Sequence, residues 1–366
     1  MIKSVITNEM LKSILTIELN RSSFKTSDMP LLTVNKLRKN SKKKSAYSSN
    51  KIEGNPLSEK QANDLLDKNN HKHLLKPEQE IINYYLAMNF LEEKLKNKEK
   101  LSKKIILDVQ AIVEKGASKE KIGLRGQMPP GMLFAVYDSK SSEPEYIPPQ
   151  YDEIESLLDE LIDYVNSTDD HPLIIAGIVH YQLVTNHPFE DGNGRTARLI
   201  SGYLLDLFGY SFNNIGSLEE YFAYDLDEYY NSLQMNLPAL YYLGRENPPH
   251  PEIWLSYFLR MVELYSVKAL EISKENSDQI VFDSLSHLNA KEKELLVYLL
   301  ENNYNTFSPI EISKILNVTN KTIINRSAKL AANGFICPNI VKQRIKSYTL
   351  NEHTRKNKDI IIKSLY

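Results

Sequence analysis

The twelve residues from His187 to Arg198, His-Pro-Phe-Glu-Asp-Gly-Asn-Gly-Arg-Thr-Ala-Arg, constrain the fold of this chain more than any other segment. Gly192 and Gly194 lack a Cβ, so the backbone between them can adopt left-handed or strained dihedral angles and aim successive N–H groups into one concavity. The residues from 195 to 209 then have apolar side chains at helical spacing and a glycine at the expected C-terminal cap. The segment therefore predicts a tight turn that opens directly into a helix.

A turn of this kind suits an anion, because the free N–H groups and the dipole at a helix N-terminus both favour negative charge. Arg195 and Arg198 lie three residues apart on the first helical turn. Since the dipole disfavours cations there, the two arginines predict an anion from outside the chain as their partner. Together these features predict a phosphate-binding site.

Two more side chains in the segment suit catalysis. His187 ends an apolar run, and an imidazole with an ordinary pKa near ~6.5 can accept a proton from a hydroxyl at neutral pH. Asp191 offers a hard oxygen ligand beside the turn, suited to one Mg²⁺ that also binds substrate phosphates. Phe189 is expected to anchor the loop in the core. Each residue alone has an ordinary structural interpretation, but their combination favours a functional site.

The segment resembles the signature of the Fic family, His-x-Phe-x-(Asp/Glu)-Gly-Asn-Gly-Arg-x-x-Arg, and matches every fixed position. Members of this family mostly transfer the AMP part of ATP to a Ser, Thr or Tyr hydroxyl of a target protein. The resemblance implies that His187 is the base that deprotonates the target hydroxyl and that Asp191 is the Mg²⁺ ligand. It also implies contacts from Arg195 and Arg198 to the β- and γ-phosphates. The implied anion hole consists of Gly192, Asn193 and Gly194.

A second motif, Ser49-Asn-Lys-Ile-Glu53-Gly54, fits the family's inhibitory pattern, (Ser/Thr)-x-x-x-Glu-(Gly/Asn). In the family this pattern lies on a helix whose glutamate enters the nucleotide site, which implies that Glu53 pairs with Arg198. A carboxylate bound to the guanidinium fork would occupy the place of the γ-phosphate. Ser49 and Glu53, four residues apart, would share one helix face. The chain then resembles the subgroup whose inhibitory helix, here around residues 45–55, precedes the catalytic core.

Composition sets broader limits. A chain of 366 residues is long enough for two or three domains. Its first twenty residues lack the core of a signal peptide, and its longest apolar run, around Leu173 to Val179, is far shorter than the ~20 residues of a membrane span. Its lone cysteine, Cys337, cannot form an internal disulfide. We therefore expect a cytoplasmic location, where ATP and Mg²⁺ are plentiful, and no membrane partner.

Most of the chain has helical periodicity, but residues 132–147 differ. Periodic segments predict helices over residues 61–67, 77–97, 101–115, 151–166 and 172–185. Two short apolar runs, Met132 to Tyr137 and Glu145 to Pro149, flank a polar tip and predict a β-hairpin. In the family a hairpin at this place, called the flap, binds a segment of the target protein as an added strand. The alternative interpretation of residues 132–147 is a hairpin without a docking role. Pro129 and Pro130 have no N–H to donate, so a docked peptide should pair only with later positions.

A tyrosine pair follows the signature. Tyr229 and Tyr230 resemble the paired tyrosines that family members place near the adenosine of the nucleotide. Stacking of an aromatic ring on adenine is physically sensible, and an aromatic pair on a helix also suits core packing. The residues alone leave both interpretations open, and the resemblance favours the nucleotide.

The C-terminal part has a different pattern. Residues 290–301, 308–316 and 319–333 predict three helices, and the spacing of the last two resembles a helix-turn-helix in which Thr319 caps the recognition helix. The residues after Gly334 are compatible with the hairpin of a winged helix.

From Ile280 to Tyr366 the chain has 13 Lys and Arg against 7 Asp and Glu, a net charge of +6 that leaves −8 elsewhere. This charge predicts DNA contact through residues 308–346; the candidates are Lys321, Arg326, Lys329, Lys342, Arg344 and Lys346. Such domains also serve as protein-interaction modules, so a homodimer is the alternative.

The expected fold is mainly α, with a Fic-type helical bundle, a β-hairpin flap and a C-terminal winged helix-turn-helix domain. The expected boundaries are 1–100 for an N-terminal helical region, 101–275 for the catalytic core and 280–366 for the last domain. The basic run from Lys36 to Lys44 is expected to be a solvated face or a flexible approach to the inhibitory helix.

Two functional hypotheses compete. The first is an auto-inhibited protein adenylyltransferase that uses ATP and Mg²⁺. The second is a DNA-binding regulator whose Fic-like domain senses a nucleotide, but a sensor needs no base, so His187 favours the enzyme. Transfer of UMP or another phosphate-containing group, and removal of AMP by water positioned with Glu53, stay open on the same site.

Overall fold

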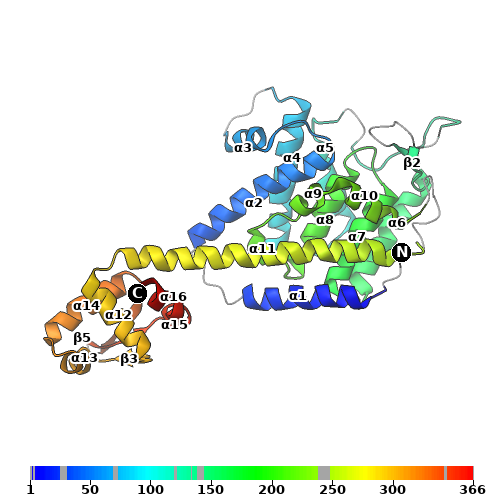
Figure 1. The fold of residues 1–366 in the computed structure, drawn as a ribbon. Coiled ribbons are helices and arrows are strands. Elements are labelled where there is room, and N and C mark those ends of the chain that lie inside the picture. The colour runs from blue at the N-terminus through cyan, green and yellow to red at the C-terminus, as the bar shows by residue number, and fades with distance from the viewer. Residues whose placement is uncertain are drawn as a thin grey trace. The chain divides into compact units, whose positions relative to one another are not determined.

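The computed structural model describes residues 2, 5–24, 31–68, 73–118, 122–132, 134–137, 144–237, 248–341 and 344–365. These residues are mainly helical, as predicted, and they divide into two compact units (Figure 1). The N-terminal unit contains the described residues up to Leu270, and the C-terminal unit contains those from Glu271 onward. Among the described helices, none combines the length and the apolar character that crossing a membrane requires.

The N-terminal unit contains helices at each position where periodicity predicts one, with small shifts at their ends. The helices are α1 (Asn8–Phe24), α2 (Leu31–Ile52), α3 (Glu59–Asp67), α4 (Lys76–Lys96), α5 (Lys103–Glu114), α6 (Ile154–Ser167), α7 (Pro172–Asn186), α8 (Asn193–Leu207), α9 (Glu219–Tyr224), α10 (Leu226–Gln234) and the part of α11 (Pro251–Ser286) up to Leu270. Two short 3-10 helices, η1 (Tyr151–Glu153) and η2 (Phe212–Asn214), join them.

Helices α7 and α8 form the centre of this unit. The residues of α7 from Leu173 to Leu183 are buried on every side, as expected for a helix that is apolar all round. Helix α8 packs against α7, α5, α4 and α2 (Figure 1). Trp254 of α11, the chain's only tryptophan, is fully buried and donates its ring N–H to the Gly177 carbonyl of α7 at 2.8 Å. The turn between α7 and α8 is therefore held by a rigid core.

Helix α2 includes the basic run from Lys36 to Lys44, so the expectation of a flexible approach is wrong. Several amines of this run form ion pairs with neighbouring helices, including Lys42 with Glu92 at 2.7 Å and Lys43 with Asp67. One face of α2 docks through hydroxyl groups: Ser45 Oγ donates to Glu219 Oε2 at 2.6 Å. These contacts fix the direction of α2, and thereby the position of the turn that follows Ile52.

Residues 132–147 contain an antiparallel strand pair, as predicted, although the strands are shorter than expected. β1 (Val136–Tyr137) pairs with β2 (Pro144–Tyr146), while Leu133 and the tip at 138–143 lie outside the described residues. The Tyr146 hydroxyl donates to the Thr185 carbonyl at 2.7 Å. This bond ties the pair to the last turn of α7.

The C-terminal unit contains the remainder of α11, further helices and a small sheet. Its helices are α12 (Ala290–Glu301), α13 (Pro309–Ile315), α14 (Asn320–Ala332), α15 (Glu352–Lys356) and α16 (Lys358–Leu365), and its strands are β3 (Thr306–Phe307), β4 (Ile336–Val341) and β5 (Arg344–Leu350). The strands form an antiparallel sheet in the order β3-β5-β4. Thr319 caps α14 as predicted, because its hydroxyl accepts from the Thr322 N–H at 3.2 Å. The helices and sheet enclose a core of their own that includes Leu295, Ile323 and Tyr348.

Candidate active site

The turn between α7 and α8 has the predicted form. His187 ends α7 in the left-handed conformation, with φ 45° and ψ 58°, and Gly192 follows with φ +83°. The Asn193 side chain closes the loop, since it accepts from the Phe189 N–H at 3.0 Å and donates to the Phe189 carbonyl at 2.9 Å. Phe189 is fully buried, as predicted. The side chain of Asn193 thus braces the turn, and an anion would meet its backbone N–H rather than its amide group.

Of the two glycines, Gly192 adopts the left-handed conformation that the sequence allows, and Gly194 does not. Helix α8 begins at Asn193, two residues earlier than predicted, so Gly194 lies within its first turn and has no positive φ. A Cβ at Gly194 would overlap Oε1 of Glu53, whereas a Cβ at Gly192 would lie 2.5 Å from Oε1 of Glu114. The missing side chain at Gly194 therefore leaves space for a negatively charged group above the N-terminus of α8.

His187 presents the tautomer that a general base needs. Its Nδ1 lies 3.3 Å from the Val184 carbonyl, which can only accept, so Nδ1 carries the proton of the neutral ring and Nε2 keeps a lone pair. Arg125 donates to the His187 carbonyl at 2.8 Å, and the Phe134 ring centroid lies 5.8 Å from the imidazole centroid. Burial, together with Arg125, outweighs the hydrogen bond to Val184 and lowers the pKa of His187 to about 4. The expectation of an ordinary pKa near ~6.5 is thus wrong, and the ring is neutral at pH 7.

Glu53 lies one residue beyond the end of α2 and reaches the first turns of α8. Its Oε1 is 2.5 Å from Arg198 Nη2, and Arg198 also donates to Ser49 Oγ at 2.8 Å and to the Ser49 carbonyl at 3.0 Å. The Arg198 side chain is 1% exposed and the Glu53 side chain 33%. Burial raises the pKa of Glu53, but Arg198 and Arg195 outweigh it and hold this pKa below its usual value. Glu53 is therefore an ionised carboxylate in the place where an anion would bind.

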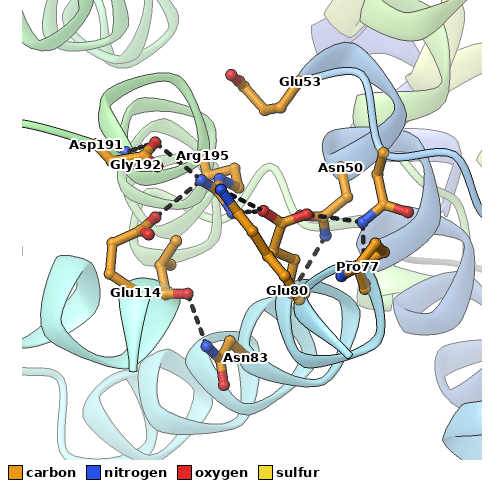
Figure 2. A network of polar contacts seen from close by, with 12 residues as sticks. Asn50, Glu53, Pro77, Glu80, Asn83, Glu114, Asp191, Gly192 and Arg195 are labelled. Carbon is orange, nitrogen blue, oxygen red and sulfur yellow. Dashed lines mark hydrogen bonds and ion pairs between the residues drawn. The ribbon is translucent and has the colours of Figure 1, made fainter. Parts of the chain in front are cut away.

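Arg195 is surrounded by three carboxylates, which come from two helices and from the turn between α7 and α8 (Figure 2). Its Nη2 lies 2.9 Å from Oε1 of Glu114 on α5 and 3.1 Å from Oδ1 of Asp191, and its Nη1 lies 3.7 Å from Oε1 of Glu80 on α4. The prediction that the two arginines bind an anion from outside the chain stays a prediction, because both already have carboxylate partners in this state. The chain's own carboxylates supply the negative charge.

Glu80 and Glu114 were not singled out from the sequence. Glu114 carries one available signal, since Gln110 and Glu114 are polar residues four positions apart on the face of α5 that Ile106 and Val113 bury in the core. Burial raises the pKa of Glu114 to about 7, against the opposing effect of Arg195. Glu80 offers no comparable signal, because it stands between the polar, half-buried Glu78 and Gln79 and the buried Ile81 and Ile82.

Asp191 lies where a Mg²⁺ ligand is expected. Its Oδ1 accepts from the Gly192 N–H at 2.6 Å and from Arg195, and 35% of its side chain is exposed. A single open carboxylate beside the helix N-terminus fits Mg²⁺, which keeps several waters and binds substrate phosphates as its other ligands. The residues present thus fit this ion.

The two tyrosines occupy different environments. Tyr229 is 1% exposed, its hydroxyl lies 2.9 Å from Nε2 of the buried His180, and its ring packs in an aromatic core with Phe222 and Trp254. The proposed stacking of adenine on Tyr229 is therefore corrected, because neither face of the ring is free. Tyr230 is 49% exposed and its hydroxyl lies 3.4 Å from the carbonyl of Ile52, the last residue of α2.

Known proteins resemble this chain in the region of the site. Residues 100–205 match the model of the Fic/DOC family. A protein adenylyltransferase Fic from Nematostella vectensis is 39% identical over 69 residues, which are 18% of this chain and 16% of that protein. One from Drosophila willistoni is 41% identical over 68 residues, 18% of this chain and 14% of that protein. The chain thus matches less than a fifth of the length of these curated relatives.

Solved structures share the fold. A Fic family protein from Desulfovibrio desulfuricans G20 is 16% identical with a TM-score of 0.58, covering 95% of this chain and 98% of that chain. Fic-1 from C. elegans is 23% identical with a TM-score of 0.55, covering 73% of this chain and 72% of that chain. At these identities the likeness concerns the fold alone.

Proposed function

Because residues 100–205 match the model of the Fic/DOC family, we propose that the chain is a protein adenylyltransferase that is inhibited by its own Glu53. It would transfer AMP from ATP to a Ser, Thr or Tyr hydroxyl of a protein in the cytoplasm. The relatives named protein adenylyltransferase Fic support this activity. The observation that carries the proposal is the placement of a neutral imidazole, whose Nε2 has no hydrogen-bond partner among the described residues, beside a helix N-terminus that bears two buried arginines.

The chemistry follows from these groups. Nε2 of His187 takes the proton of the target hydroxyl while the hydroxyl oxygen attacks the α-phosphorus of ATP. A new P–O bond to the target forms, the bond between the α-phosphorus and the bridging oxygen breaks, and pyrophosphate leaves with that electron pair. The first N–H groups of α8, with Arg195 and Arg198, would hold the β- and γ-phosphates. Asp191 would hold Mg²⁺, whose charge neutralises phosphate oxygens when it is bound.

Inhibition follows from the position of Glu53. Its carboxylate takes the Arg198 donors that a γ-phosphate needs, and it lies in the space above Gly194. Two negative groups cannot share this space, so ATP binds productively only after Glu53 leaves. Because a third of the Glu53 side chain is exposed, it can swing into water.

The target would dock on the hairpin at residues 132–147. The β2 strand is tied to Thr185, two residues before His187, so a peptide added to the hairpin edge would have its hydroxyl close to the base. Main-chain hydrogen bonds would supply the affinity with little demand on the target sequence.

The test is labelling of a lysate with ATP labelled in the α-phosphate. Wild type, Glu53→Gly and Glu53→Gly/His187→Ala are compared, with Glu59→Gly as the matched control because Glu59 is an exposed glutamate outside the site. A charge-assisted hydrogen bond to a guanidinium contributes about 1.5–3 kcal/mol, so Glu53→Gly should raise labelling on the order of tenfold to a hundredfold. Loss of His187 should abolish the gain. Equal labelling with and without His187 would contradict the proposal, and label from UTP rather than ATP would redirect it to another nucleotide.

A second candidate function concerns the C-terminal unit, and we propose that residues 308–346 bind duplex DNA as a winged helix-turn-helix. The α14 helix exposes Lys321 and Lys329, and β5 exposes Arg344 and Lys346. A helix capped by Thr319 beside a basic hairpin suits the major groove and its phosphates. Lys342 lies outside the described residues.

Salt-dependent binding tests this second function. Fluorescence anisotropy with a mixed-sequence duplex should show binding that weakens as salt rises, and Lys321→Glu/Lys329→Glu should weaken it further. Lys291→Glu on α12 is the matched control, since Lys291 is equally exposed outside this surface. Absence of DNA binding with a concentration-dependent change in mass would favour the homodimer instead.

A further inference from the structure

Helix α5 contacts the signature turn with two buried polar side chains. Gln110 Nε2 donates to the Asp191 carbonyl at 3.2 Å, and four residues later Glu114 pairs with Arg195 at 2.9 Å. Gln110 is itself fixed, since its Oε1 accepts from the Gly123 N–H at 3.0 Å. One rigid face of α5 therefore supports both the loop that carries Asp191 and the guanidinium of Arg195.

Glu114 has no route away from this position. Its side chain is 2% exposed, and one carboxylate oxygen lies in the space left by the missing Cβ of Gly192. Moving Glu114 away would also leave the buried Arg195 without its nearest carboxylate, and an unpaired buried charge is costly. Glu114 thus differs from a group that could exchange with a nucleotide, and it belongs to the permanent structure of the site.

The Arg195 guanidinium has hydrogen-bond donors that the described residues leave unpaired. Its side chain is 3% exposed, yet among the described residues neither Nε nor Nη1 has a hydrogen-bond acceptor, and the Glu80 oxygen at 3.7 Å is too distant for one. Buried donors without acceptors are unfavourable, and guanidinium donors match phosphate oxygens in geometry. The unused edge of Arg195 therefore points to an anionic ligand.

We propose that Glu114 is a positioning residue that holds Arg195 by its Nη2 edge and leaves Nε and Nη1 for the phosphates of the nucleotide. This inference rests on the proposed function. Arg195 has a second carboxylate partner in Asp191, at 3.1 Å. Without Glu114, Asp191 becomes the main partner of Arg195, and the same carboxylate is then less available to Mg²⁺. Glu114 therefore keeps Arg195 from pairing fully with Asp191, so that the Asp191 carboxylate stays available to Mg²⁺.

The experiment uses the full chain with Glu53→Gly as the parent, so that inhibition is absent. Glu114→Gln keeps the size of the side chain and removes its charge. We expect the Kd of ATP, measured calorimetrically with Mg²⁺, and the KM for ATP to rise about tenfold, while kcat changes less than threefold. The Mg²⁺ concentration for half-maximal binding should also rise. Asp108→Asn, on the partly exposed side of α5, is the matched control and should match the parent.

Two further variants keep the inference testable if Glu114→Gln folds poorly. Glu114→Asp retains the charge but shortens the side chain, so its effect on Kd should be in the same direction and smaller. Arg195→Lys removes the Nε donor, and Glu114→Gln should add nothing to it, because the glutamate acts only through that arginine. An unchanged Kd in both Glu114 variants, or a full additive effect in the double variant, would overturn the inference. A parent that binds ATP without transferring AMP would instead defeat the proposed activity and leave the Kd comparison valid.

Discussion

The two arginines of α8 meet carboxylates of opposite character. Glu53 stands in a turn beyond the end of α2 with 33% of its side chain exposed, while Glu114 ends α5 with 2% exposed. Each carboxylate lies where a glycine lacks a Cβ, Glu53 at Gly194 and Glu114 at Gly192. A carboxylate paired with an arginine can thus be a removable inhibitor, as Glu53 is, or a permanent support, as Glu114 is. The exposure of the carboxylate to water decides between the two roles.

The largest expected difference between Glu114 and Glu53 is in the free energy of unfolding that is lost when each is replaced by alanine. Glu114→Ala leaves a cavity and takes the nearest carboxylate from the buried Arg195, so we expect a loss of about 3 kcal/mol in the free energy of unfolding. Glu53→Ala exposes Arg198 to water and leaves its bonds to Ser49, so the loss should stay within about 1 kcal/mol. Urea unfolding followed by Trp254 fluorescence reports on the N-terminal unit. Similar losses for both variants would remove the basis of the comparison.

The two glycines should respond differently to alanine. Gly192→Ala combines strain at φ +83° with overlap of a carboxylate that cannot move, and should cost about 2 kcal/mol or more. Gly194→Ala gains helix propensity of up to about 1 kcal/mol, displaces Glu53, which can turn into solvent, and places its Cβ 3.2 Å from Arg198 Nη1. Its net change should stay within about 1 kcal/mol in the same urea measurement. The cost of Gly192→Ala should fall in a Glu114→Ala background, and an unchanged cost there would mean that backbone strain alone accounts for it.

Much of this site was predictable because its signal is local. The order of base, carboxylate, glycines and arginines lies within twelve residues, and the pairing of Glu53 with Arg198 follows from the resemblance of a short motif. Helix ends were predictable for the same reason, as Thr319 shows.

What could not be predicted depends on contacts between distant segments. Glu80 and Glu114 reach Arg195 from helices whose local pattern says nothing of the signature. The low pKa of His187 comes from burial, which is a property of the folded core. Tyr229 and Tyr230 are neighbours of identical chemistry, and only the fold assigns one to the core and the other to the surface.

The pH dependence of transfer extends the comparison to the base. Glu53 raises the pKa of His187, which is about 4, so removal of Glu53 lowers this pKa further. A base acts in its neutral form, which predominates above its pKa. The rate of Glu53→Gly at saturating ATP should therefore be nearly the same at pH 5.5 and 7.5, whereas an imidazole of ordinary pKa would lose about tenfold. A tenfold fall toward pH 5.5 would show that the ring becomes exposed once Glu53 is gone.

The smallest expected change in the rate of transfer is that of a variant at Asn55, which supports the turn that carries Glu53. Its Nδ2 donates to the Pro77 carbonyl at 2.9 Å and to Glu80 Oε2 at 2.8 Å, so it links this turn to α4. A hydrogen bond of this kind contributes about 1 kcal/mol, so Asn55→Ala should release Glu53 more often and raise transfer severalfold. Asn97→Ala, an exposed asparagine on the same unit, should leave the rate unchanged. If the turn is the removable element and α5 the fixed one, the gain must vanish in a Glu53→Gly background. A gain that persists there would assign Asn55 to the support of Arg195 through Glu80, and the division between movable and fixed carboxylates would then lie elsewhere.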